Sequence, residues 1–460
     1  MLRAVAVALG ISLISLLLVA PAPAPSYDPW AWLLWGRELA AGGLSTVDGP
    51  AFKPLPVAAC ALLAPLGAAA PWLWVLLVRA AAVVAALLAF DLARRLAGGS
   101  QLAGALGAAA VLLCGGLPAY TAAGAEPALV LALALGAAAA WRERRMRIAL
   151  ACAVGCALLR VEAWPFVALA GVMLWRRRRQ DRALLAALAV AVPAAWLTPE
   201  LIGSGDLLRS GGRARVPNPG QPALASVPGI EALKEAVMLP LWPFWGGVAV
   251  LLAASIRAPH GTARSSGEAA RRALVPAAAG AAWIAIVALM AQAGFSGEPR
   301  YALPGAALIA LSGAVGLARV ATNVISIPPW VIEMTLVALV ALAAAPRLAD
   351  LADVRSAQAY QWRLAGDLAD AVDAAGGADA VLACGRPYVG PLRGPLMAYR
   401  MDVPKRVVEP DEPPRPPGVV FRSALSSASP AAPDAPPQFT EIARAGTWQV
   451  LAACDGAPST

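Results

Sequence analysis

The chain has 460 residues, of which 59% are hydrophobic and 14% are charged, and its formal net charge is +9. This composition excludes an ordinary soluble protein, which needs more polar side chains to cover its surface. Apolar runs recur at about the 17 to 25 residues that a helix needs to cross a bilayer. Because these runs do not alternate, and only helices and closed barrels satisfy their backbone groups in lipid, we predict a polytopic α-helical membrane protein.

The predicted spans follow one another along the first three quarters of the chain. They lie near residues 3–20, 72–92, 102–118, 126–141, 148–160, 163–175, 183–198, 236–256, 273–293, 302–319 and 328–346. This gives roughly eleven crossings of the membrane. The first segment also resembles a signal peptide, because Arg3 precedes the apolar run and "VAPAPA" follows it. A retained first span is the expectation.

Basic residues gather in short connectors and set the predicted orientation. The clusters are Arg94-Arg95, "WRERRMR" at 141–147, "RRRRQDR" at 176–182 and the arginines from Arg257 to Arg272. Such clusters between spans are typical of cytoplasmic loops rather than of nucleic-acid binding. We therefore predict a multi-pass protein of the cell membrane, with a cytoplasmic N-terminus and a C-terminal tail outside the cytoplasm.

The first external loop, residues 21–71, holds the densest polar and aromatic chemistry of the chain. Asp28 opens "DPWAWLLWGRELA", which predicts an amphipathic helix at the membrane interface with Asp28 as its cap and Pro29 at its first position. Asp28 is then either the cap of an interfacial anchor or a carboxylate placed where a lipid headgroup meets a water-soluble partner. Lys53 is one of only three lysines, and it precedes an apolar segment at 54–70 that we expect along the outer surface. Its ammonium group is suited to hold a lipid phosphate.

Catalysis outside the membrane would have to rest on carboxylates, with Arg, Lys and Tyr as helpers. The single histidine, His260, lies in a predicted cytoplasmic loop, and the sequence contains no HExxH motif, GxGxxG motif or P-loop. Several external acids have simpler explanations. Arg160 and Glu162 in "LLRVEAWP" are expected to pair with each other at the membrane edge. Glu200 lies in a Gly-rich outer loop.

Residues 347–460 differ from the rest and predict a small external α/β domain, with residues 1–346 forming the membrane domain. A helical stretch leads into a predicted strand at 380–384, and "RVVE", "GVVFRS" and "TWQVLAAC" predict further short strands. Pro-rich loops separate them. Cys384 and Cys454 lie in this domain, where an oxidising compartment would let them form a disulfide. The other four cysteines lie in apolar segments and are expected to pack as small side chains.

Three stretches together resemble a known superfamily. They are "RELAAGGLSTVDGPAFKPLP" after the acid at 28, "RAAAVVAALLAFDLARRL" at 79–96 and "GEPRYALPGAALIALSG" at 297–313. Their order resembles that of GT-C membrane glycosyltransferases, in particular protein O-mannosyltransferases and aminoarabinose transferases of the family 39-like type. The chain departs from the family pattern in two places, because "DP" replaces an acidic pair and Lys-Pro-Leu-Pro replaces Lys-Pro-Pro.

The resemblance implies a GT-C fold and an inverting hexosyltransferase. Such an enzyme passes a mannose-like or related sugar from a polyprenyl-phosphate donor to an external protein, lipid or glycan. It implies that Asp28 is the base and that Glu126 is a second acid lining the cavity. Lys53 and Arg300 would hold the donor phosphate with Tyr301 nearby, and Asp48 or Glu126 would replace the lost acid. No cofactor is implied, and cations can in principle neutralise a phosphate leaving group without a metal. A version that depends on a divalent metal stays open, and it would need clustered acids, which the sequence does not show clearly.

Two other classes of function stay open from the sequence alone. A transporter or flippase would also have many spans, but it would place ionisable groups near the middle of them. The predicted spans are nearly free of charge, with Asp91 near a cytoplasmic end. A non-catalytic scaffold that displays the external tail would make the first-loop acids dispensable.

Overall fold

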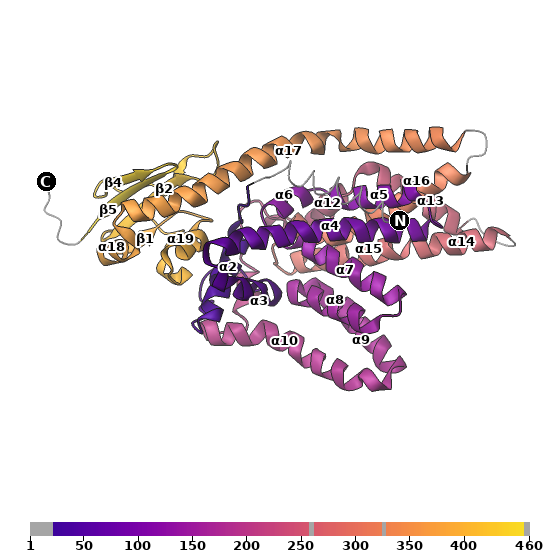
Figure 1. Cartoon of the computed structure of the whole chain (residues 1–460), viewed down its shortest axis with the longest axis horizontal. Coiled ribbons are helices and arrows are strands. Elements are labelled where there is room, and N and C mark those ends of the chain that lie inside the picture. Colours follow the sequence, from indigo (N-terminus) through magenta and orange to yellow (C-terminus); the bar gives the residue numbers. More distant parts are fainter. Residues whose placement is uncertain (1–21, 257–261, 324–327, 455–460) are drawn as a thin grey trace.

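The computed structural model describes residues 22–256, 262–323 and 328–454. The predicted first span at 3–20 and His260 lie outside these residues. The molecule is elongated, with a helical bundle at one end and a small α/β domain at the other (Figure 1). The helix α17 (Pro329–Ala374) runs along the bundle and continues into the α/β domain. It passes the predicted domain boundary at residue 346 without a break, so the division into two domains stays a prediction.

Helices build the bundle. They are α2 (Tyr27–Ala40), α3 (Pro54–Leu63), η1 (Ala64–Ala69), α4 (Ala70–Leu96), α5 (Gln101–Leu112), α6 (Leu117–Ala122), α7 (Pro127–Arg142), α8 (Met146–Leu159), η2 (Val161–Ala163), α9 (Trp164–Arg177), η3 (Arg179–Asp181), α10 (Arg182–Ser204), α11 (Arg209–Arg213), η4 (Pro222–Leu224), α12 (Pro228–Met238), α13 (Trp242–Ile256), α14 (Thr262–Ala273), α15 (Val275–Gln292) and α16 (Pro299–Asn323). The basic helix α14 lies at the end of the bundle farthest from the α/β domain (Figure 1).

Five helical stretches in the described part of the chain are long and apolar enough to cross a membrane: Pro54–Leu96, Arg179–Ser204, Gly267–Gln292, Pro299–Ala321 and Pro329–Ala374. A sixth arises if α12 and α13, which meet at 95°, count as one broken span. The apolar helices α5, α7 and α8 are shorter, and at 1.5 Å per residue each falls short of a bilayer core of about 30 Å. The protein is thus a helical membrane protein, and the count of roughly eleven crossings stays a prediction.

The helix α16 is the most deeply buried of the candidate spans. It packs closely against α13, because a Cβ atom at Gly247 would overlap the backbone of Gly313. The side chain of Ser312 accepts a hydrogen bond from the backbone of Ala277 at 2.9 Å, which joins α16 to α15. These contacts hold α16 as a rigid support.

The helix α2 forms where it was predicted, but the prediction of an amphipathic surface helix is wrong. All residues from Asp28 to Gly36 are buried. Trp32 makes an edge-on contact with Trp74 of α4 at 5.6 Å, and Trp30 lies 5.2 Å from Tyr399 of the α/β domain. A Cβ atom at Gly36 would overlap Cys60 of α3. The faces of α2 that we expected to contact lipid and water are therefore covered by α3, α4 and the α/β domain.

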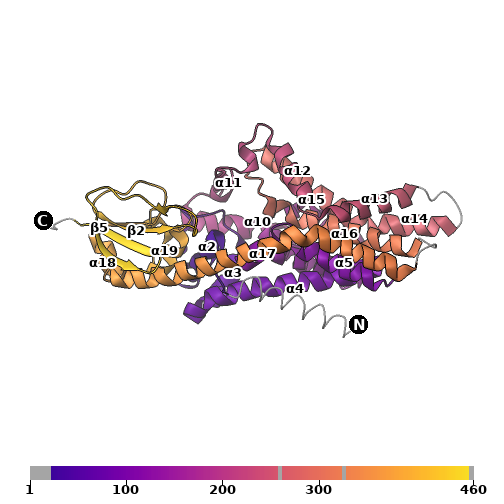
Figure 2. The ribbon, with the colours of Figure 1, turned by 90° about the horizontal axis from the view of Figure 1, so that it is seen from above.

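The α/β domain packs the outer half of α17 and two short helices against a sheet (Figure 2). Its elements are α18 (Gly377–Cys384), β1 (Arg386–Tyr388), α19 (Gly394–Met401), η5 (Lys405–Val407), β2 (Gly418–Ala424), β3 (Ala431–Ala432), β4 (Thr440–Ala445) and β5 (Trp448–Ala453). The strand order is β1-β2-β5-β4, with β3 paired to β2. β1 runs parallel to β2, and the other pairs are antiparallel. Trp448 donates a hydrogen bond to the carbonyl of Leu364 in α17 at 2.8 Å.

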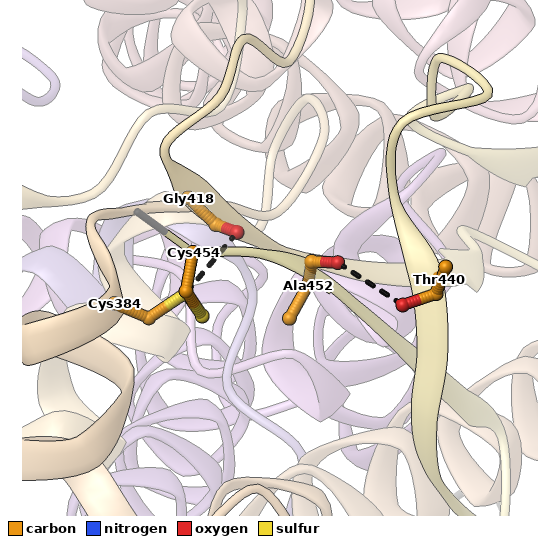
Figure 3. The surroundings of a disulfide bond; sticks show 5 residues. All are labelled: Cys384, Gly418, Thr440, Ala452 and Cys454. Atoms are coloured by element: carbon orange, nitrogen blue, oxygen red, sulfur yellow. Dashed lines mark hydrogen bonds between the residues drawn. A yellow bond between two sulfur atoms is a disulfide. The ribbon is translucent and has the colours of Figure 1, made fainter. Parts of the chain in front are cut away.

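Two of the predicted strands are confirmed and two are wrong. "GVVFRS" and "TWQVLAAC" form β2 and β5. Residues 380–384 instead belong to α18. A short apolar run fits both the periodicity of a helix and that of a strand, so the sequence alone did not distinguish them. "RVVE" begins as a 3-10 turn, with one bridge between Tyr388 and Glu409. Cys384 and Cys454 form a disulfide that ties α18 to the end of β5 (Figure 3).

Candidate active site

A cavity of about 1090 Å³ lies where the ends of the bundle helices meet the α/β domain. The starts of α2 and α16, the end of α8 and the loop after α10 line it, together with residues of the α/β domain. Its ionisable lining residues are Tyr27, Asp28, Asp48, Lys53, Arg160, Glu162, Asp206, Arg209, Arg213, Glu298, Arg300, Tyr301, Lys405 and Asp411. Such a large concave site with convergent charges is the first candidate for an active site.

Prolines set the positions of the main charged groups at the ends of helices. Lys53 is followed by Pro54 at the start of α3, and Glu126 by Pro127 at the start of α7. Arg300 follows Pro299 in the first turn of α16. Proline is favoured in the first turn, where its missing N–H leaves no hydrogen bond unmade. Each helix therefore begins at the charged residue, and the side chains converge at one end of the bundle.

Asp28 is bound by Arg300, which comes from 272 residues later in the chain. Arg300 Nη1 donates a hydrogen bond to Asp28 Oδ2 at 2.9 Å, and Arg300 Nη2 donates one to the hydroxyl of Tyr301 at 3.2 Å. Arg300 also forms an ion pair with Glu298, which accepts a hydrogen bond from Gln221. The predicted N-cap role of Asp28 is wrong. The cap is Ser26, and Asp28 lies inside the first turn of α2.

A second group of contacts surrounds Glu126, whose relative exposure is 1%. Lys53 Nζ lies 2.5 Å from Glu126 Oε1, and Arg160 Nη1 lies 3.1 Å from the same oxygen. Burial raises the pKa of this carboxyl group, but Lys53, Arg300 and Arg160 lower it by more. The pKa of Glu126 is therefore below its usual value, and the group stays ionised.

Lys53 connects the two groups of contacts. Its ammonium lies 3.8 Å from Asp28 Oδ2 and 2.5 Å from Glu126 Oε1.

Two guanidinium groups lie near the ring of Tyr301. That of Arg160 is 3.7 Å from the ring centre, and that of Arg300 is 5.1 Å from it. Both cations therefore contact the same ring, which helps to hold the two guanidinium groups in place. Arg160 also donates a hydrogen bond to Glu162 at 3.0 Å, so the predicted pairing of these two residues is confirmed.

Asp48 lines the cavity but makes none of the hydrogen bonds or ion pairs found among the described residues. The support on its side of the cavity comes from Glu200, which is fully buried and accepts a hydrogen bond from the Ser210 hydroxyl. Arg209 donates hydrogen bonds to the carbonyls of Gly49 and Pro50 at 2.8 and 2.7 Å. These contacts hold the segment that leads to Lys53.

The wall opposite the bundle belongs to the α/β domain. Pro391, Leu392, Lys405, Pro410 and Asp411 line the cavity there. Lys405 is 7% exposed, and no hydrogen bond or ion pair within the described ranges reaches its ammonium group. At the rim, burial and then the charge of Asp28 raise the pKa of Tyr27 to about 12, so its phenol stays protonated.

The structure brings together five of the residues singled out in the sequence: Asp28, Lys53, Glu126, Arg300 and Tyr301. The sequence did not reveal that Arg160 joins them or that Glu298 and Lys405 belong to the same site. The sequence did offer one indication for Arg160, which is a charged residue next to a long apolar stretch. The rarity of lysine, which marked Lys53, applies equally to Lys405. No group of three or more His, Cys, Asp or Glu residues that could hold a metal ion occurs in residues 22–256, 262–323 and 328–454.

The fold of the chain, a helical membrane bundle with buried charges at one end and a small α/β domain beside them, is found in a solved membrane protein. The chain is similar to the solved structure of ArnT from Cupriavidus metallidurans in the apo state, with 15% sequence identity and a TM-score of 0.55, over 98% of this chain and 97% of that one. A structure of ArnT bound to undecaprenyl phosphate matches with 15% identity and a TM-score of 0.49, over 100% and 99%. No protein-family model and no curated protein matches the chain.

Proposed function

We propose that the chain is a glycosyltransferase that moves a hexose or related sugar from a polyprenyl-phosphate donor to an acceptor outside the cell membrane. In this proposal the N-terminus is cytoplasmic and the α/β domain is extracytoplasmic. The observation that carries the proposal is the contact of Asp28 with Arg300 and Lys53 at the wall of a large cavity. One carboxylate and two cations then face the same space, as a sugar phosphate and an acceptor hydroxyl require.

The cations would receive the donor phosphate. Lys53 carries three N–H donors, and Glu126 is its only partner at hydrogen-bonding distance among the described residues. Arg300 and Arg160 flank Tyr301 with fixed guanidinium planes. As the sugar leaves, the phosphate gains negative charge, and cations already in place stabilise that charge without reorganising.

Asp28 would act on the acceptor. The acceptor oxygen attacks the anomeric carbon and forms the new C–O bond, while the bond from that carbon to the phosphate oxygen breaks. The electron pair leaves with polyprenyl phosphate, and the acceptor proton passes to Asp28. Attack from the face opposite the phosphate gives inversion at the sugar.

Glu126 suits a positioning role better than proton transfer. It is buried, it does not line the cavity, and it contacts both Lys53 and Arg160. Asp48 lines the cavity and is suited to contact the sugar or the acceptor through its carboxylate. On the opposite wall, Lys405 lines the cavity, and its ammonium suits an acceptor that carries a negative group near its hydroxyl.

The position of the charges also argues against a transporter. Glu126 precedes α7, Arg160 follows α8, and Arg300 lies in the first turn of α16, so the network is at the ends of these helices. Alternating access normally uses a site near the middle of the membrane. A scaffold has no use for a buried network of cations beside a large cavity.

The test is sugar transfer in membranes supplied with labelled polyprenyl-phosphate sugars, with native chain and Asp28→Asn at equal protein levels. We expect the variant to lose about 10²- to 10⁴-fold in transfer, the range for a missing general base. Asp91→Asn is the matched control, because Asp91 pairs with Arg94 and Arg95 on a partly exposed surface away from the cavity. Full transfer by Asp28→Asn, or transfer by neither protein with any donor, would contradict the proposal.

A further inference from the structure

A second cavity, of about 270 Å³, lies between α2, the α3–η1 segment and α19 of the α/β domain. Its lining is Leu33, Arg37, Cys60, Ala64, Gly67, Ala68, Ala70, Tyr399 and Arg400. None of these residues lines the active-site cavity. The second cavity is therefore a separate site, and its ligand can be inferred independently of the proposed glycosyltransferase activity.

Two arginines, Arg37 and Arg400, line this cavity. Arg37 is held in place, because its Nη1 donates to the Tyr399 carbonyl at 3.0 Å and its Nε lies 3.0 Å from Asp402 Oδ1. Arg400 lies over Trp30, 5.8 Å from the ring centre, and forms none of the ion pairs found in the described chain. Its Nε is buried without a hydrogen-bond partner there. The carboxylate of Asp402, which pairs with Arg37, is 80% exposed, and the charge of Asp370 acts on Arg400.

The α3–η1 segment, which lines part of this cavity, and the first turns of α4 expose apolar side chains. Leu62 at the end of α3 is 82% exposed, and Leu66 in η1 and Trp72 at the start of α4 are also exposed. Leu76 and Leu77, one turn further along α4, are exposed as well. This stretch belongs to Pro54–Leu96, which is long and apolar enough to cross a membrane, so its exposed apolar side chains are suited to contact lipid.

We infer that this cavity binds the phosphate headgroup of an anionic phospholipid whose acyl chains lie along the exposed face that begins at Leu62. Guanidinium groups bind phosphate through paired, charge-assisted hydrogen bonds, and both Arg37 and Arg400 line this cavity. Only a ligand with both a phosphate and long apolar chains uses the charged cavity and the apolar face together. A bound lipid would contact α19 on one side and α2, which carries Asp28, on the other. It would therefore join the α/β domain to the helix of the active site.

The test is lipid binding to the purified full chain in detergent, measured by native mass spectrometry with phosphatidylglycerol, phosphatidylcholine or inorganic phosphate. We expect one tightly bound phosphatidylglycerol and an affinity about tenfold lower in Arg400→Gln, the loss of roughly one charge-assisted hydrogen bond. Arg444→Gln is the matched control, since Arg444 is an exposed arginine on β4 that does not line the cavity. Arg400→Lys should restore part of the affinity.

A second variant guards against a folding defect in Arg400→Gln. Ala68→Phe fills the cavity from its exposed rim and leaves both arginines in place, so it should also lower phosphatidylglycerol binding. Equal affinity in native chain, Arg400→Gln and Ala68→Phe would overturn the inference. So would phosphatidylcholine binding as tightly as phosphatidylglycerol, or inorganic phosphate displacing the lipid completely.

Discussion

The two ends of α7 carry glutamates in opposite surroundings. Glu126, at the start of the helix, is 1% exposed and contacts Lys53 and Arg160. Glu143, just past the other end, has a side chain that is 46% exposed and lies 3.4 Å from Arg145. Both are Glu–cation pairs at helix ends, yet the first must be stabilised by protein alone and the second is hydrated. A Glu–cation contact therefore contributes to the stability of the fold at the buried end of α7 and contributes little at the exposed end.

Two kinds of charge can therefore be distinguished. Buried charges fix the geometry of side chains near the cavity, and exposed charges favour one orientation of the chain in the membrane. Exposed basic residues, such as Arg271 and Arg272 in α14, need only be positive to favour one side of a membrane. Buried charges need partners at specific distances, because each unpaired charge would be strongly unfavourable in the protein interior. Substitutions that keep charge but change geometry should therefore affect only the cavity end.

The largest effect should follow from Glu126→Gln. Lys53 and Arg160 would lose the carboxylate between them, and breaking a buried pair typically lowers the free energy of unfolding by about 3 to 5 kcal/mol. Thermal and denaturant unfolding in detergent, followed by tryptophan fluorescence, would measure it. Glu143→Gln is the matched control on the same helix and should change stability by about 0.5 kcal/mol or less. Equal losses of unfolding free energy in the two variants would contradict the claim that the contacts of Glu126 stabilise the fold more than those of Glu143.

A smaller effect is expected from Arg300→Lys, which keeps the charge but loses the fork that reaches Asp28 and the Tyr301 hydroxyl. The efficiency of sugar transfer, kcat/KM for the donor, should fall about ten- to a hundredfold. The same exchange at Arg95, which pairs with Asp91 on the exposed side of α4, should leave transfer unchanged. If Arg300→Lys transfers sugar normally, the geometry of this guanidinium is unimportant and only its charge matters.

The smallest effect concerns Glu38, a half-buried acid near the end of α2. Burial raises its pKa to about 7, against the opposing hydrogen bond from Ser45 N–H and the charge of Arg37. The folded chain therefore binds this proton more tightly than the unfolded chain, and stability should fall as pH rises from about 4.5 to about 7. Glu38→Gln removes this dependence. Its unfolding temperature relative to the native chain should rise across that interval, and a constant difference would contradict the assignment.

The sequence predicted the membrane class from its long apolar runs, and Asp28 and Lys53 could be singled out from the polar chemistry of the first loop. Glu126, Arg300 and Tyr301 were singled out only through the resemblance to GT-C glycosyltransferases, and their roles stay predictions. The burial of α2 could not be predicted, since the covering helix α19 comes from more than 350 residues later in the chain. A Trp-rich helix looks the same whether lipid or protein covers it. Lys405 was overlooked for the same reason, because only the folded chain shows that it faces the cavity.

The most direct test of the central claim is a cryo-electron microscopy structure of the full chain in lipid nanodiscs with polyprenyl phosphate. We predict that the phosphate lies within about 3 Å of the Lys53 ammonium and the Arg300 guanidinium, next to the Asp28 carboxylate. A phosphate bound elsewhere, with the Lys53–Glu126 and Arg300–Asp28 contacts unchanged, would contradict the assignment of this site to the lipid donor.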